Sequence, residues 1–100
     1  MSQVTRRDGK IIFTKEQQER FSVASPTSPE SALLTADAFT DVAQKMVAAV
    51  TELDTIGTRD EALDMMRKQA RATELALFAA EITTVCAPEL AQRLNIARNV

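Results

Sequence analysis

The sequence predicts an all-α protein with a short N-terminal helix, a long antiparallel helical hairpin and a short C-terminal helix. The 100 residues include only two glycines and three prolines, while good helix formers are plentiful. Residues 58–86 contain neither glycine nor proline, and apolar residues recur at steps of three and four on both sides of Gly57. A chain of this length forms one domain with a modest core.

The N-terminal segment, residues 1–13, is predicted to be either a flexible arm or a β-hairpin, and residues 14–100 to be a single helical domain. Asp8-Gly9 is a type I′ hairpin signal. Thr14 and Gln17 have the spacing of a capping box, which predicts a short helix over residues 15–24. The prolines in residues 25–29, SPTSP, indicate a linker.

The long hairpin is predicted to have arms at about 29–55 and 59–86. Ser28 caps the first arm, and a second capping box opens the other arm at Thr58 and Glu61. We expect Gly57 to end the first arm in a left-handed conformation. The first arm carries two apolar stripes, one of Phe39, Val42, Met46, Ala49, Leu53 and Ile56, the other of Ala36, Ala43, Val47 and Val50.

The second arm also carries two stripes. We expect Leu63, Met66, Ala70 and Leu77 to face the first arm, which leaves a separate stripe beginning at Leu75. Pro88 opens the last helix, 88–98. One hairpin cannot bury four stripes, so the sequence predicts a homo-oligomer, with a closed monomeric four-helix bundle as the alternative. The expected interface residues are Val47, Val50, Leu75, Phe78, Ile82 and Val85.

The composition argues against catalysis. The chain has no histidine, tyrosine or tryptophan, no glycine-rich phosphate loop and no zinc pattern, so we predict no enzyme, no metal site and no cofactor. Cys86 is the sole cysteine and has apolar neighbours, which predicts a buried structural thiol in a cytoplasmic protein. Asp37 and Asp41 share a helix face, but they offer too few oxygens for a hard cation.

One candidate anion-binding site remains. Thr58 and Arg59 stand at a helix N-terminus, which favours negative charge, and Arg67, Lys68 and Arg71 follow on the same helix. Copies in an oligomer could bring these residues together around a phosphate group. The alternative is a solvated surface on which they pair with neighbouring carboxylates. A net charge of −2 and the lack of stacking aromatics argue against nucleic acid, and no apolar run is long enough to cross a membrane.

The second arm also resembles a known family. The stretch Thr58-Arg59-Asp60-Glu61-Ala62-Leu63, with the later Glu74-x-x-Leu77-Phe78-Ala79 and Ile82, is similar to small phage proteins that sequester cyclic nucleotides against CBASS immunity. The similarity covers about 30 of the 100 residues. This chain differs by an apparent insertion, by phenylalanine where tryptophan is usual, and by an extra C-terminal helix. The resemblance implies a multimeric, non-catalytic ligand sponge.

These observations predict a non-enzymatic, oligomeric helical binding protein that sequesters or blocks a partner, as an accessory or anti-defence factor of a phage or mobile element. Two alternatives remain. One is a sponge for cyclic or other phosphorylated nucleotides, and the other is a structural or chaperone-like subunit. The expected partner is therefore a protein or a nucleotide-like small ligand.

Overall fold

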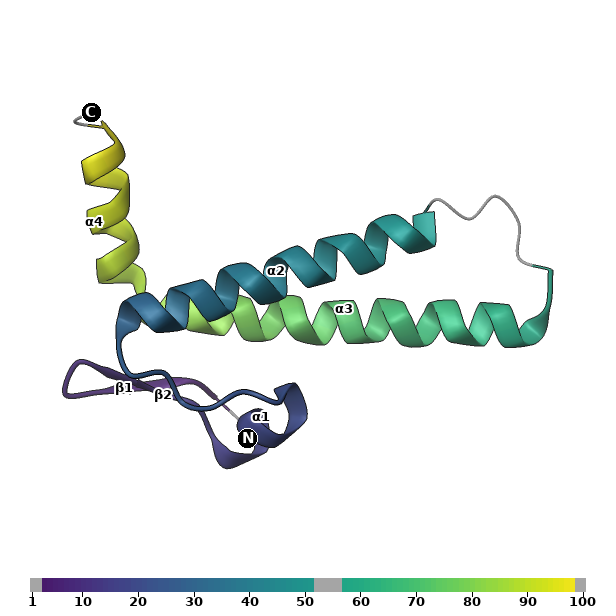
Figure 1. Ribbon diagram of the computed structural model, residues 1–100, viewed down its shortest axis with the longest axis horizontal. Coiled ribbons are helices and arrows are strands. Elements are labelled where there is room, and N and C mark those ends of the chain that lie inside the picture. Colours follow the sequence, from purple (N-terminus) through teal and green to yellow (C-terminus); the bar gives the residue numbers. More distant parts are fainter. Residues whose placement is uncertain (1–2, 52–56, 99–100) are drawn as a thin grey trace.

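The computed structural model describes residues 3–51 and 57–98, which form a small β-hairpin and four helices (Figure 1). The strands are β1 (Thr5–Arg7) and β2 (Lys10–Ile12), and the helices are α1 (Lys15–Phe21), α2 (Pro29–Thr51), α3 (Arg59–Val85) and α4 (Ala87–Arg98). The predicted order of helices is confirmed. The strict all-α prediction is wrong, because the N-terminal segment adds a two-stranded antiparallel sheet.

The hairpin forms at the turn that the sequence signals. Asp8 and Gly9 have φ of 52° and 78°, as a type I′ turn requires, and Arg7 pairs with Lys10 across it. An isolated two-stranded hairpin is marginal in water. This one is anchored because Ile11 is buried in the core, together with Val4, which precedes β1, and Phe13, which follows β2. Of the two predicted alternatives for this segment, the structure has the hairpin.

The helix starts follow local hydrogen bonds. The predicted capping box is complete in α1: the Gln17 N–H donates to Thr14 Oγ1 at 3.0 Å, and the Thr14 N–H donates to Gln17 Oε1 at 2.9 Å. Ser28 Oγ accepts from the Ser31 N–H at 3.1 Å and so caps α2. The first of these helices ends earlier than predicted, at Phe21, because Ser22 turns left-handed with φ of 53°.

The connection between the long helices differs from the prediction at Gly57. The described residues with positive φ are Asp8, Gly9 and Ser22, so the predicted left-handed conformation of Gly57 is wrong. Gly57 instead precedes the cap of α3, and its N–H donates to Glu61 Oε2 at 3.0 Å. The predicted end of the first arm, near residue 55, lies outside the described residues, as do Leu53 and Ile56.

The packing of α2 against α3 buries members of both predicted stripes of α2 and one stripe of α3. The side of α2 that packs inward contains the residues Ala36, Phe39, Ala43, Met46 and Val50. On α3 the buried residues are Ala72, Leu75, Phe78, Ala79 and Ile82. Val42, which belongs to the predicted apolar stripe of Phe39 and Met46, is 44% exposed.

The predicted inward seam of α3 is also wrong. Leu63, Met66 and Leu77 are exposed, as is Ala70. Leu77 lies about 200° around the helix from Leu75, at 100° per residue, so a helix that turns one of them toward α2 turns the other to solvent.

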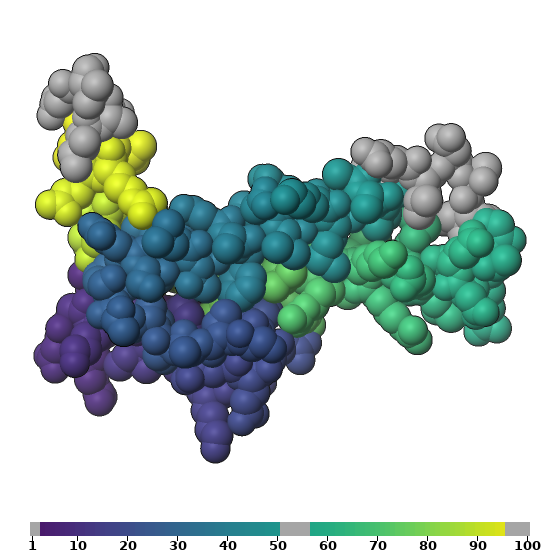
Figure 2. Space-filling view, viewed as in Figure 1, coloured from purple at the N-terminus to yellow at the C-terminus, as the bar shows by residue number. Residues whose placement is uncertain are grey.

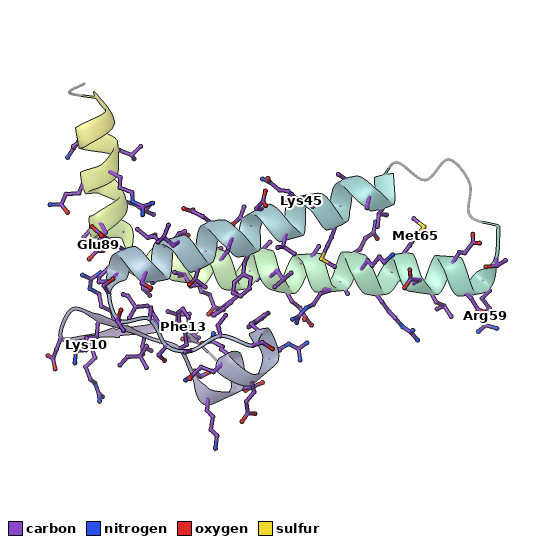
Figure 3. All side chains as sticks on the ribbon, in the orientation of Figure 1. Lys10, Phe13, Lys45, Arg59, Met65 and Glu89 are labelled. Carbon is purple, nitrogen blue, oxygen red and sulfur yellow. The ribbon has the colours of Figure 1, made fainter. Side chains whose placement is uncertain are left out.

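The core is centred on Phe78, which is 2% exposed. Its ring stacks on Phe21 with the centroids 4.4 Å apart, and it lies 5.0 Å from Phe13 and 5.6 Å from Phe39. The four phenylalanines of the chain therefore join α1, the segment after β2, α2 and α3. Figure 3 shows Phe13, at the end of the N-terminal segment, beside the long helices.

The far half of α3 has little cover. None of residues 59–70 is buried, and Figure 2 shows this half extending beyond the body formed by the N-terminal segment and α2. At the opposite end α4 projects away from the pair of long helices (Figure 1). Arg6 attaches the N-terminal segment to α4 by donating to Glu89 Oε2 at 2.9 Å. The radius of gyration is 16.3 Å, against about 13 Å for a compact chain of this length.

In the part of the chain that the structure describes, no helix combines the length and the apolar character needed to cross a membrane.

Candidate binding site

A groove of about 500 Å³ lies between the middle turns of α2 and α3. We call it the α2/α3 groove. Its lining residues are Thr40, Ala43, Gln44, Val47 and Ala48 from α2 and Ala72, Thr73 and Ala76 from α3. Ala43 and Ala72 form its buried floor, and Val47, 46% exposed, stands on its wall.

The chemistry of the α2/α3 groove is apolar and uncharged. Five of its eight lining residues are alanine or valine and none is ionisable, so it offers no acid, base or counter-ion. Small side chains on both helices keep it shallow and allow another backbone to come close. Such a surface suits the apolar face of an amphipathic helix, a recurring mode of peptide recognition.

The predicted anion-binding residues do not meet within one chain. Thr58 and Arg59 lie at the tip of α3, where Figure 3 shows Arg59, and Arg71 follows about 18 Å along the helix. Thr58 Oγ1 already caps α3, because it accepts from the Glu61 N–H at 3.1 Å. Lys68 pairs with Asp64 at 3.0 Å. A phosphate site at these residues therefore needs more than one copy of the chain and stays a prediction.

Arg71 has a structural position at the contact between α1 and α3. Its guanidinium donates to Glu74 Oε2 at 3.2 Å and to the Arg20 carbonyl at 3.1 Å, and it lies 5.1 Å from the centre of the Phe21 ring. A hydrogen bond from Arg20, reinforced by Arg71, holds the pKa of the Glu74 carboxyl below its usual value. Arg67, in contrast, is exposed and has no ion pair with a described residue.

The predicted interface residues divide into covered and exposed ones. Leu75, Phe78 and Ile82 lie in the core of the chain itself, Val50 is buried, and Val85 is partly buried against that core. Leu75, Phe78 and Ile82 are covered by α2 and the N-terminal part of the chain. Val47 is the member of the set that remains exposed, and it is the one that lines the α2/α3 groove.

A polar junction that the sequence did not reveal lies at Glu81. Its Oε2 accepts from the Val4 N–H at 3.2 Å and from Gln17 Nε2 at 3.1 Å. Gln17 is 4% exposed and uses its other side-chain atom in the cap of α1. The capping spacing of Gln17 was visible in the sequence, but its second partner is 64 residues away. The junction attaches the N-terminal segment to α3.

Cys86 is fully buried, as predicted, and burial raises the pKa of its thiol. Its neutral S–H lies 3.9 Å from the Pro29 carbonyl. Asp41 pairs with Lys45 at 2.9 Å and Asp37 lies 3.8 Å from Arg93, so each carboxylate has a cation nearby. Among the described residues no three potential metal ligands gather.

No protein-family model matches the chain, and neither the curated proteins nor the solved structures include one significantly similar to it. The resemblance to the phage sponge proteins therefore remains a prediction.

Proposed function

We propose that this chain is a non-enzymatic, oligomeric binding protein that sequesters or blocks a protein partner by holding a helix of that partner in the α2/α3 groove. The observation that carries the proposal is the open, uncharged groove with Ala43 and Ala72 as its floor. A closed bundle would have filled this space with its own side chains, as protein interiors do.

The lining of the groove sets what its partner should look like. With no charge in the lining, the bound face should be apolar, and shallow walls of alanine and threonine favour small or branched side chains spaced by three and four residues. The charges of Asp41 and Lys45 lie close by on α2. They pair with each other at 2.9 Å, are mostly exposed and do not line the groove, so we expect no contact between them and the bound helix.

The test is photo-crosslinking from single positions in the cells that make the protein. A photoreactive residue replacing Val47, on the wall of the groove, should give discrete adducts with another protein. The same residue replacing Lys45, on the outer side of α2 in Figure 3, is the matched control and should give few. Equal labelling from both positions, or no adduct from Val47, would refute the groove as the binding site.

The same experiment separates the alternatives. Adducts that contain only this chain would mean that the groove joins copies, which favours the structural subunit. The nucleotide sponge makes a different prediction. A saturating phosphorylated nucleotide, at a hundred times its dissociation constant, should stabilise the protein by about 2.7 kcal/mol. This gain should vanish with Arg59→Ala if the anion site is real.

A further inference from the structure

The face of α3 that points away from α2 carries a row of exposed residues with the spacing of a coiled-coil seam. We call it the outer stripe. It consists of Leu63, Met66, Ala70, Thr73, Leu77, Ala80 and Thr84, which are all exposed and uncharged. Thr73 lies at the margin of the stripe and also lines the α2/α3 groove. The steps alternate between three and four residues, the pattern that keeps a row in line with a partner helix. The row runs for about 32 Å.

The described chain does not cover the outer stripe. Leu77 is next to α1, yet it remains 61% exposed, and Met66 is 64% exposed on the far half of the helix. Each large apolar side chain left in water forgoes the favourable free energy of its burial. Leu63, Met66 and Leu77 together therefore provide a substantial driving force for association.

We propose that the outer stripe is a homodimer contact, in which α3 of a second copy packs antiparallel against it. The inference gives the oligomer of the proposed function its contact surface, and it rests on that oligomeric state but not on the α2/α3 groove. Pairing about a point between Ala70 and Thr73 sets Met66 against Leu77 of the second copy and Leu63 against Ala80 of the second copy. Every large residue then has a partner, and large residues face small ones at the ends.

Charge along the edges of the outer stripe favours the antiparallel direction. One edge carries Arg67, Glu74 and Glu81 at intervals of seven residues, and the other carries only the uncharged Ala62, Gln69, Ala76 and Thr83. Antiparallel pairing brings the two charged edges together, so Arg67 of one copy lies axially between Glu74 and Glu81 of the other. Parallel pairing would set each charged edge against an uncharged one.

The local partners of these charges agree with that arrangement. Glu81 accepts hydrogen bonds from a backbone N–H and from an amide, and no described cation pairs with it. Arg67 likewise has no ion pair with a described residue. The antiparallel dimer gives each of them an opposite charge within reach, at both ends of the contact by symmetry.

The first measurement is the mass of the purified protein by sedimentation velocity at micromolar concentration. The wild type should sediment at about 22 kDa, twice the chain mass of 11.0 kDa. Leu77→Glu should sediment as a monomer with an unchanged far-ultraviolet circular dichroism spectrum, because the side chain is exposed. Leu94→Glu is the matched control, since Leu94 is 63% exposed on α4, and it should stay dimeric. A monomeric wild type, a dimeric Leu77→Glu or a monomeric Leu94→Glu would overturn the proposal.

The second measurement tests the direction with single cysteines. Met66→Cys and Leu77→Cys chains are oxidised separately and then as an equal mixture. An antiparallel contact should give a disulfide-linked dimer in the mixture, while each variant alone gives little. Cross-linking of each variant alone would indicate a parallel contact and overturn the proposal, as would no cross-linking in any sample. The buried Cys86 of the wild type serves as the uncrosslinked control.

These results are independent of the proposed function. A dimer through the outer stripe without adducts from Val47 would support the dimer contact and refute the groove as a binding site. Adducts from Val47 in a monomeric protein would support the groove as a binding site and refute the dimer contact.

Discussion

Replacing Phe78 with alanine should remove a large part of the protein's free energy of unfolding. The ring is 2% exposed and packs against the other three phenylalanines, with centroids 4.4–5.6 Å away. Removing a buried phenylalanine costs about 3–5 kcal/mol through lost burial and the cavity left behind. A domain of this size has a total stability of about 5–15 kcal/mol. Phe78→Ala therefore removes between a fifth and nearly all of it.

Urea denaturation followed by circular dichroism measures this effect at one fixed protein concentration. With a slope of about 1–3 kcal/mol per molar urea, the midpoint should fall by more than about 1 M. Lys68→Ala on the same helix is the control, because its ion pair with Asp64 is exposed and should contribute under about 0.5 kcal/mol. If the alanine variant has no folded baseline, Phe78→Leu keeps most of the volume and should lose an intermediate amount. A loss below about 1 kcal/mol for Phe78→Ala would refute the central position of this ring.

Two further predictions concern the turn glycines and the thiol. Gly9→Ala should cost about 1 kcal/mol because its φ is +78°, although nothing lies within 4 Å of an added Cβ. Gly57→Ala should change stability by under about 0.5 kcal/mol, since the nearest atom to the added Cβ is Glu61 Oε2 at 3.6 Å. Thermal melts compare the two variants, and equal losses would contradict the conclusion that only Gly9 of these two needs a positive φ. The buried Cys86, with its raised thiol pKa, should react with a thiol reagent far more slowly in the native protein than in urea, and rapid native labelling at neutral pH would show that the site is open.

The sequence determined the features that depend on neighbours along the chain. The cap at Thr14, the cap at Ser28 and the turn at Asp8-Gly9 each arise from a hydrogen bond or a backbone preference within four residues. Their positions could therefore be read from residue types alone, and with them the order of the helices. Gly57 is the exception, because a glycine between two helices suits either the end of one helix or the approach to the next.

The candidate site was only partly visible in the sequence. Val47 was predicted as an interface residue and is exposed in the structure, but the groove beside it depends on alanines of α3 that lie against α2. Alanine carries little signal in a sequence, since it suits a helix whether it is buried, exposed or part of a groove. The polar junction at Glu81 was hidden for another reason, because its partners lie more than 60 residues away.

Only the tertiary structure decided which side of α3 faces inward. The stripe through Leu75 and the stripe through Leu77 have the same spacing of three and four residues, so periodicity cannot rank them. The choice depends on cover: Phe13, Phe21 and Phe39 come from three distant segments and converge on Phe78, which belongs to the stripe through Leu75. Burying four rings together outweighs burying Leu63, Met66 and Leu77, because aromatic side chains remove the largest apolar area from water. The outer stripe is what that choice leaves exposed.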